Sequence, residues 1–320
     1  MQNRKVIIYG LGTDYENSKY FLEESFDILA YSDKDENKYL KFENGIPPAK
    51  IKDYPYEFIY ITSQKHAGEI KKELEQMGID QSKLLTIADA WWSFDEQKIR
   101  DEWIINRIKE IPDGFTLLDA GAGNMPYKKY CAHLKYISQD FGEYDDSVKE
   151  EALQVEEWHS KNADIISDIV NIPINDKSVD VVLCTEVLEH IKNPVEALQE
   201  FGRIIKKDGI LLLTAPFCSL THMAPYYYAN GFSQYWYEEH LREAGFEILE
   251  IVPYGNWFTY MALELQRLPY VTTRYRGEVC SEDIYKQLVK MVKILMAQSN
   301  SDNGSSELLC HGFFVKARKE

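Results

Sequence analysis

The chain has 320 residues, a hydrophobic fraction of 45% and a formal net charge of −16. This length favours two domains, or one domain with a large addition. The negative charge would repel a phosphate backbone, and no Lys/Arg cluster offsets it, so we expect no nucleic-acid partner. With no run of eighteen apolar residues and no signal-peptide pattern, we expect a cytoplasmic protein that does not insert into membranes.

The cysteines of the chain give no sign of a disulfide framework or a metal centre. They are widely scattered, without a C-x-x-C pair and without a His at ligand spacing from any of them. We therefore expect reduced, mostly buried thiols and no metal site. The residues concerned are Cys131, Cys184, Cys218, Cys280 and Cys310.

Residues 1–90 alternate strand-like runs with helical ones, which predicts a small parallel α/β domain. The strand-like runs are KVIIYG, DILAYSD, EFIYITS and KLLTI, and the helical runs are NSKYFLEES and HAGEIKKELEQMG. Residues 91–113 follow with apolar residues at helical spacing and end in a Pro-Asp-Gly turn signal. They predict a helical linker.

The alternation starts again in residues 114–320, which predicts a second α/β domain. Its strand-like runs are TLLDAG, KYISQD, VDVVLCTE, GILLLTAP, FEILEIVP and LLCHGFFVKAR, with a helix at PVEALQEFGRIIK. About fifty residues separate the last two strands and include the helical run SEDIYKQLVKMVKILMAQ. We expect an insertion at about 254–305, and an insertion of this length is usually functional or a lid.

Two strand-to-helix turns carry a Gly-x-Gly pattern, at residues 10–12 and 121–123. Either turn would let the backbone approach a nucleotide closely. Both lack the third glycine of the dinucleotide-binding fingerprint, because Tyr15 and Pro126 stand in its place. The pattern alone therefore indicates little, and the residues around each turn must distinguish them.

Acidic residues at three successive strand ends distinguish the second turn. Asp119 precedes Gly121 by two residues and could stabilise a cationic amino group, while Asp140 ends the next strand and could accept two ribose hydroxyls. Asp168 stands before an Ile-Pro turn and could receive an adenine amino group. Each acid alone could be only a turn former. Together they predict an adenosyl ligand that carries positive charge.

The run from Asp168 to Pro216 resembles the signature block of class I S-adenosylmethionine-dependent methyltransferases of the type 11 family. With LLDAGAGNMPY and YISQDF, the resemblance extends over about residues 116–216. It implies a seven-stranded Rossmann-like α/β sheet with an antiparallel last strand, and S-adenosylmethionine across the carboxyl ends of the strands. The cofactor-binding residues that it implies are Asp119, Gly121 and Gly123 in the loop, Asp140 at the ribose, Asp168 and Ile169 at the adenine, and Glu186 at the methionine end.

Two histidines are candidates for the base that a hydroxyl acceptor requires. Methyl transfer from a sulfonium is an in-line displacement, so the protein mainly aligns the reactants, and a base removes the acceptor's proton. His222 follows the fifth strand by a short loop that we expect over the cofactor. His190, in VLEHI, lies just beyond Glu186. A structural role, such as bracing a helix or a loop, is the alternative for both.

The loop continues into a dense aromatic stretch in which Tyr226, Tyr227 and Tyr228 are candidates for acceptor binding. Aromatic faces with hydroxyl tips suit a sugar. Core packing beneath a helix explains at least half of the stretch equally well, because Tyr235, Trp236 and His240 fall at helical spacing. The stretch is similar to methyltransferases found with bacterial surface-glycan assembly enzymes. This similarity implies a sugar acceptor, as a nucleotide-linked sugar or a glycan intermediate.

The front domain resembles the small Rossmann-like domain that precedes some sugar-modifying enzymes, including sugar N-acetyltransferases. On this resemblance Gly10, Gly12 and Asp33 could bind a nucleotide, and a scaffolding role is the alternative. A NAD-dependent sugar oxidoreductase or epimerase would use this domain, but residues 1–90 offer no convincing Tyr-x-x-x-Lys pair. A different small-molecule acceptor, a non-enzymatic scaffold and a homodimer also stay open.

Overall fold

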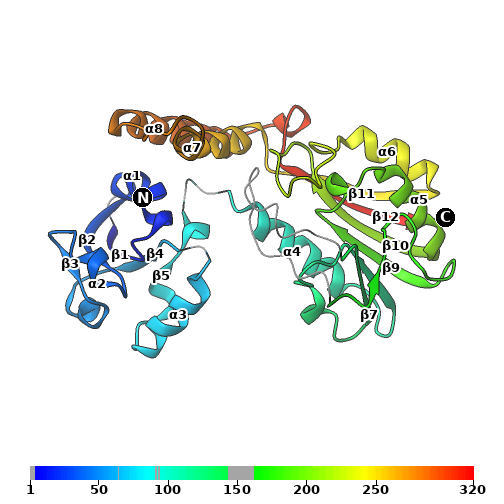
Figure 1. Ribbon diagram of the computed structural model, residues 1–320, viewed down its shortest axis with the longest axis horizontal. Helices are drawn as coiled ribbons and strands as arrows, with labels where there is room; N and C mark the ends of the chain where they lie inside the picture. The colour runs from blue at the N-terminus through cyan, green and yellow to red at the C-terminus, as the bar shows by residue number, and fades with distance from the viewer. Residues whose placement is uncertain (1–3, 64, 91, 93, 143–161) are drawn as a thin grey trace. The chain divides into compact units, whose positions relative to one another are not determined.

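The computed structural model describes residues 4–63, 65–90, 92, 94–142 and 162–320, and its internal contacts divide the chain into two compact units (Figure 1). The first unit comprises Met1–Asp95 and Phe258–Asp302, and the second comprises Glu96–Trp257 and Asn303–Glu320. Most of the stretch expected as an insertion at about 254–305 thus makes its contacts with the front residues.

The first unit contains a five-stranded sheet in the order β3-β2-β1-β4-β5, with every pairing parallel. The central strand carries Val6, Ile7 and Ile8 in succession, all fully buried. Such a continuous apolar run is typical of a parallel strand covered on both faces. The strands are β1 (Arg4–Tyr9), β2 (Phe26–Ser32), β3 (Gly45–Ile46), β4 (Phe58–Ile61) and β5 (Leu84–Leu85).

Helices from both ends of the sequence belong to this unit. Helix α8 lies against α1, where the rings of Tyr20 and Tyr285 stack with centroids 4.4 Å apart. The expectation of a smaller parallel α/β domain is confirmed. The helices of the unit are α1 (Thr13–Ser25), α2 (Glu36–Tyr39), α3 (Ala67–Gln76), α7 (Trp257–Arg276) and α8 (Glu282–Ser299).

The second unit contains a seven-stranded sheet in the order β11-β12-β10-β9-β6-β7-β8. Strand β12 runs antiparallel to both β10 and β11, and the other pairings are parallel. The expected seven-stranded sheet with an antiparallel last strand is therefore confirmed. Its strands are β6 (Thr116–Ala120), β7 (Lys135–Asp140), β8 (Ile165–Ile166), β9 (Val179–Thr185), β10 (Ile205–Pro216), β11 (Phe246–Tyr254) and β12 (Gly312–Lys319).

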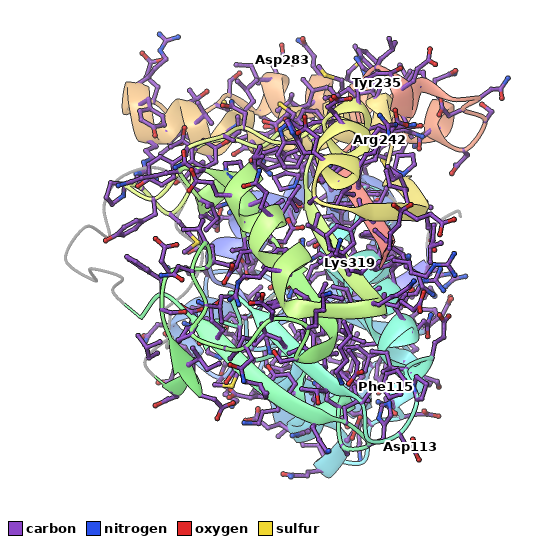
Figure 2. All side chains as sticks on the ribbon, turned by 90° about the vertical axis from the view of Figure 1, so that its right-hand side faces the viewer. Asp113, Phe115, Tyr235, Arg242, Asp283 and Lys319 are labelled. Carbon is purple, nitrogen blue, oxygen red and sulfur yellow. The ribbon has the colours of Figure 1, made fainter. Side chains whose placement is uncertain are left out.

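Helices cover both faces of this sheet: α5 (Pro194–Ile204) and α6 (Gln234–Glu243) on one face and α4 (Glu96–Lys109) on the other (Figure 1). Ile104 of α4 packs with Leu117, while Phe201 of α5 packs with Tyr237 of α6. Tyr235, two residues earlier on α6, is 78% exposed, and its side chain projects from the helix (Figure 2). The aromatic stretch is thus divided between core and surface.

Helix α4 begins at Glu96, later than the start of the helical linker expected over residues 91–113. Within the part of the chain that the structure describes, no helix has the length and apolar character needed to cross a bilayer. All five cysteines are free and all but Cys218 are buried, as expected. Short 3-10 turns complete the elements: η1 (Pro48–Asp53), η2 (Gln81–Lys83), η3 (Ile87–Asp89), η4 (Lys128–Tyr130), η7 (Leu188–His190) and η8 (Ser305–Glu307).

Candidate functional site

The second Gly-x-Gly turn follows β6 at the carboxyl edge of the seven-stranded sheet. Gly121 and Gly123 have φ values of 75° and 49°, in the left-handed region that favours glycine. A Cβ on Gly121 would lie 2.5 Å from Cγ2 of Val187. The N–H of Gly121 donates to the carbonyl of Gln139 at 2.9 Å. Both conformation and packing therefore require glycine at position 121.

Asp140 joins the end of β7 to this turn. One carboxylate oxygen accepts the N–H of Gly123 at 2.8 Å, and the other accepts the N–H of Gly142 at 3.3 Å. Each oxygen of an ionised carboxylate can accept more than one hydrogen bond. The fold thus brings together Asp140 and the glycine turn, as their positions at neighbouring strand ends predicted.

Asp119 lies beneath the turn, on the face of β6 that also carries Leu117. Its carboxylate is 2% exposed and accepts a hydrogen bond from the Tyr136 hydroxyl at 2.5 Å. Burial raises the pKa of Asp119 to about 7, the hydrogen bond from Tyr136 opposes this shift, and the negative charge of Asp140 adds to it. Tyr136 is thus the hydrogen-bond partner of the Asp119 carboxylate. The expected contact between Asp119 and a cationic amino group stays a prediction.

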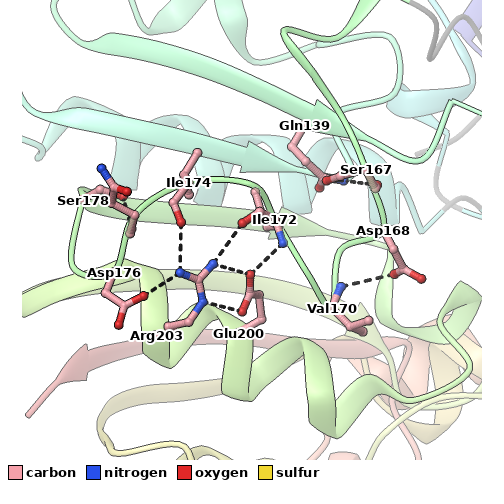
Figure 3. A network of polar contacts seen from close by, with 11 residues as sticks. Gln139, Ser167, Asp168, Val170, Ile172, Ile174, Asp176, Ser178, Glu200 and Arg203 are labelled. Atoms are coloured by element: carbon pink, nitrogen blue, oxygen red, sulfur yellow. Dashed lines mark hydrogen bonds and ion pairs between the residues drawn. The ribbon is translucent and has the colours of Figure 1, made fainter.

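Asp168 follows β8 at the start of a tight turn (Figure 3), and Ile169 is the next residue along the chain. Asp168 is exposed, and its carboxylate accepts the N–H of Val170 at 3.2 Å, whereas the Ile169 side chain is buried. An apolar surface next to an exposed acid suits the flat face and the amino group of a purine. The structure brings these two residues together at the edge predicted for the adenine.

Arg203 of α5 fixes the segment that follows this turn (Figure 3). Its guanidinium donates to the carbonyls of Ile172 and Ile174, each at 2.9 Å, and pairs with Glu200 at 2.6 Å. Glu200 also accepts the N–H of Ile172 at 2.7 Å. The sequence analysis missed this pair, although Glu200 and Arg203 stand three residues apart on a predicted helix, where side chains are neighbours.

Glu186 follows β9 with a φ of 53°, which is uncommon for a residue other than glycine. One carboxylate oxygen accepts the Thr214 hydroxyl at 2.8 Å, and the other lies 3.2 Å from a guanidinium nitrogen of Arg100. Strained backbone of this kind gathers at functional sites. The sequence analysis missed Arg100, because it comes from α4, far from the other site residues in the chain.

His190 and His222, predicted separately, lie side by side with ring centroids 4.8 Å apart. His190 Nδ1 is 2.6 Å from the carbonyl oxygen of Tyr226, and His222 Nδ1 is 2.9 Å from that of Leu220. A carbonyl can only accept, so both Nδ1 atoms carry the proton and both Nε2 atoms keep a lone pair in the neutral ring. Burial lowers the pKa of His190 to about 4, which keeps this ring neutral.

Glu189, which the sequence analysis did not select, completes this cluster. Its side chain is 1% exposed, and one oxygen lies 3.7 Å from His190 Nε2 and 4.0 Å from His222 Nε2. Burial raises the pKa of Glu189 well above its usual range, and the negative charge of Glu186 adds to this effect. The other oxygen has no hydrogen-bond partner among the described residues. The feature of the sequence that could have pointed to Glu189 is its position directly before His190 in VLEHI.

The three candidate tyrosines lie in the loop after β10 and differ in their surroundings. The ring of Tyr226 lies 6.3 Å from that of Phe141, which follows β7, so the loop reaches across the carboxyl edge. The Tyr227 hydroxyl donates to the Ser219 carbonyl at 2.6 Å. Tyr228 is exposed, and its N–H donates to the Glu189 carbonyl at 2.8 Å. Tyr226 and Tyr228 are thus better placed for a ligand than Tyr227.

In the front turn, too, an acid at the end of the next strand accepts a backbone N–H. Asp33 accepts the N–H of Leu11, between Gly10 and Gly12, at 2.6 Å. It also lies 3.6 Å from the ammonium of Lys38. The structure therefore brings together Gly10, Gly12 and Asp33 within the first unit, and their binding of a nucleotide stays a prediction.

Two family models match separate stretches of the chain. Residues 118–213 match one described as a methyltransferase domain, and residues 2–85 match one described as C2185-like, N-terminal. The first stretch runs from β6 to β10 and carries Asp119, the glycine turn, Asp140, Asp168, Glu186 and His190. It is a class I methyltransferase domain, and the cofactor of this domain is S-adenosylmethionine.

Curated proteins similar to this chain include methyltransferases with different acceptors. The (S)-coclaurine N-methyltransferase of Thalictrum flavum subsp. glaucum is 28% identical over 172 residues, which cover 52% of this chain and 45% of that protein. The ubiquinone biosynthesis O-methyltransferase of Rickettsia bellii is 26% identical over 156 residues, covering 45% and 61%. An uncharacterised protein of Methanocaldococcus jannaschii is 42% identical over 119 residues, covering 35% and 48%. The matches thus extend over about half of the length of these relatives.

Among solved structures, a SAM-dependent methyltransferase from Archaeoglobus fulgidus aligns with a TM-score of 0.41 and 16% identity, covering 70% of this chain and 97% of that one.

Proposed function

We propose that this chain transfers a methyl group from S-adenosylmethionine to a hydroxyl or amine of a sugar, carried as a nucleotide-linked sugar or a glycan intermediate. When bound, the cofactor supplies an electrophilic methyl group on a positively charged sulfonium. The observation that supports this proposal best is a row of acids at the carboxyl ends of β6 to β9 next to the paired imidazoles of His190 and His222.

The residues at this edge fit the cofactor by charge and by shape. Asp140 would bind the ribose hydroxyls, while Asp168 and Ile169 would hold the adenine. The turn at residues 121–123, which has no side chain at its two glycines, lets the backbone approach the ligand. These groups give the edge a negative charge, which favours a ligand that carries a sulfonium and an ammonium group.

Glu186 and Arg100 would hold the methionine end. Glu186 is a candidate partner for the ammonium group, and Arg100, 3.2 Å from it, offers a guanidinium that can bind a carboxylate with two hydrogen bonds. The two side chains already form an ion pair of the same kind as an amino acid's own ammonium and carboxylate. A bound methionine moiety would therefore replace the Glu186–Arg100 ion pair with two ion pairs, one between Glu186 and the ligand's ammonium group and one between Arg100 and the ligand's carboxylate.

The acceptor would lose its proton at the imidazole cluster. His222 is the better candidate base, because its side chain is 25% exposed whereas that of His190 is 6% exposed. Its Nε2 lone pair can take the proton of an acceptor hydroxyl, while Nδ1–H stays on the Leu220 carbonyl. His190, held by the Tyr226 carbonyl, would position the loop.

A sugar acceptor is supported by the aromatic residues beside this cluster. Tyr226 and Tyr228 combine flat apolar faces with hydroxyl groups, and Lys192 lies 5.8 Å from the ring of Tyr228. Such surfaces bind ligands with apolar ring faces and polar edges. An aromatic or alkaloid acceptor is the second candidate, because relatives named for coclaurine and ubiquinone biosynthesis match the same region.

Turnover with a panel of acceptors tests this function. The protein is incubated with S-adenosylmethionine and nucleotide-linked sugars, catechols or secondary amines, and S-adenosylhomocysteine is quantified by mass spectrometry. We expect turnover with a nucleotide-linked sugar. His222→Ala should lower kcat by about 100-fold, with an unchanged affinity for S-adenosylhomocysteine. His240→Ala, which removes a histidine bonded to Glu243 on the outer part of α6, is the matched control.

Three results would count against parts of this proposal. Turnover with catechols or amines alone would exclude the sugar acceptor. Equal kcat values for His222→Ala and the unmodified protein would exclude His222 as the base. No turnover with any acceptor, despite cofactor binding, would favour a binding protein built on a methyltransferase fold.

A further inference from the structure

The loops after β9 and β10 bring two imidazoles and one carboxylate to a single point. Glu189 and His190 come from η7, and His222 comes from a loop 32 positions further along the chain. One ligand atom from each side chain lies within 4.8 Å of the other two. Two imidazoles with one carboxylate form a donor set that binds divalent transition metals in many proteins.

The orientation of both rings matches that of metal ligands. A histidine that binds a metal almost always donates its other N–H to a carbonyl or a carboxylate, which fixes the tautomer and the ring. His190 does so to the Tyr226 carbonyl and His222 to the Leu220 carbonyl. Both Nε2 lone pairs are thus available on the side of Glu189.

Glu189 offers the strongest sign that a cation belongs in this place. Its side chain is 1% exposed, and Oε2 lacks a hydrogen-bond partner in the described part of the chain, whereas Oε1 is the oxygen that lies nearest to the two Nε2 atoms. A buried acceptor without a partner costs free energy that native proteins normally avoid. The backbone around Glu189 is nevertheless well held, because its carbonyl accepts the N–H groups of Tyr228 and Ala229 at 2.8 Å and 3.2 Å.

The distances are compatible with an ion after a small contraction. Ligand atoms that share a metal at about 2.1 Å are roughly 3.0–3.4 Å apart in tetrahedral or octahedral geometry. The carboxylate oxygen lies 3.7 Å and 4.0 Å from the two Nε2 atoms. Movement of His222, whose loop side chain is the most exposed of the three, would close the larger of these two differences.

We propose that Glu189, His190 and His222 bind one divalent transition-metal ion, such as Zn²⁺, with at least one coordination position left for water or for an acceptor hydroxyl. This goes beyond the proposed function and changes one of its steps. A His222 Nε2 lone pair that binds the ion cannot also take a proton, so His222 would act as a metal ligand and not as the base. A hydroxyl that ligates such an ion has a lowered pKa. Its O–H bond would break with the proton passing to water, and the oxygen would form the new bond to the methyl carbon as the sulfur–methyl bond breaks.

Calorimetric titration with Zn²⁺ tests this proposal on the full chain, after dialysis against a chelator and without S-adenosylmethionine. We expect one saturable site with a Kd of about 1 µM or tighter. Glu189→Gln and His222→Ala should each weaken binding by at least about 30-fold. The matched control is His240→Ala, because His240 and Glu243 form an exposed His–Glu pair with a 3.0 Å contact. This control should leave the affinity unchanged.

Co²⁺ provides a second reading, because coordination by imidazole nitrogen gives it a characteristic visible absorption. The spectrum should appear in the unmodified protein and in His240→Ala and be absent in His222→Ala. His222 is partly exposed in a loop, so this variant stays informative if Glu189→Gln fails to fold.

Absence of a saturable Zn²⁺ site would overturn the proposal, as would equal affinity in His222→Ala or loss of the site in His240→Ala. The titration contains no cofactor and no acceptor. Failure of the metal site is therefore distinct from failure of the methyl-transfer proposal, which would appear as absent binding of S-adenosylhomocysteine or absent turnover.

Discussion

The turns at residues 10–12 and 121–123 share one local design but have different surroundings. In each turn an acid from the end of the next strand accepts a backbone N–H, Asp33 from Leu11 at 2.6 Å and Asp140 from Gly123 at 2.8 Å. Around the front turn, Lys38 lies 3.6 Å from the acid, whereas a second buried acid, Asp119, lies beneath the other turn.

This difference teaches that the turn pattern alone does not define a ligand. The lysine beside Asp33 offsets its charge, which makes the front turn a poor site for a cation. The acids around residues 121–123 accumulate negative charge, which favours a cationic ligand such as a sulfonium. The charge around each turn and the packing of its glycines, rather than the presence of the Gly-x-Gly pattern, separate the two sites.

The largest expected effect concerns Asp119, which has no counterpart in the front turn. Burial raises its pKa to about 7, well above the ordinary value of an aspartic acid, so the native state binds this proton more tightly than the unfolded chain does. The contribution of this proton to the free energy of unfolding is fully present below about pH 4 and is lost as the pH rises to about 7. The loss amounts to about 4 kcal/mol. Asp119→Asn should remove this loss.

Urea unfolding at a series of pH values checks this expectation, with hydrogen exchange used to follow peptides of the second unit. The difference in unfolding free energy between Asp119→Asn and the unmodified protein should grow between pH 4 and pH 7 and then level off. A difference that stays constant over this range would mean that Asp119 ionises normally.

The glycines give the second largest contrast. Gly121→Ala should cost about 2–4 kcal/mol, because the residue has a positive φ and its Cβ would clash with Val187. Gly12→Ala should cost less than about 1 kcal/mol, because φ is −91° and the nearest atom to its Cβ is the mobile Lys38 Nζ at 4.0 Å. Denaturant melts resolved by hydrogen exchange measure both values. Equal costs would contradict the difference in packing.

A smaller effect is expected for the front acid. Asp33→Ala removes the acceptor for the N–H groups of Leu11 and Asp35, which should destabilise the first unit by about 1–2 kcal/mol. Hydrogen exchange in peptides of β1 and β2 should accelerate, while exchange in β6 and β7 stays unchanged. Faster exchange in both units would show that the acid supports more than its own turn.

The sequence was sufficient to predict the second sheet and most of its edge. Parallel strands end at the same edge, so the positions of Asp140 and Asp168 after successive strands predicted their common location. The helix α8 was also predicted from its apolar spacing. Helix α7 was not, because Pro269 lies within it and prolines normally end a helical pattern.

The imidazole cluster was only half predicted. His190 and His222 were both selected, but their contact depends on the path of the loop after β10, which no sequence period specifies. The expectation of no metal site rested on the spacing of ligands along the chain, whereas these two histidines are 32 positions apart. Glu189 was missed because its significance lies in the burial of one oxygen that has no hydrogen-bond partner within the described ranges, which the sequence does not reveal.

Calorimetric titration with S-adenosylhomocysteine most directly tests the claim that the second turn, and not the front turn, holds the cofactor. We predict one site in the unmodified protein, affinity reduced by about 50-fold or more in Asp140→Ala through loss of charged hydrogen bonds, and unchanged affinity in Asp33→Ala. Absence of binding to the unmodified protein, or a loss in Asp33→Ala with none in Asp140→Ala, would contradict the assignment.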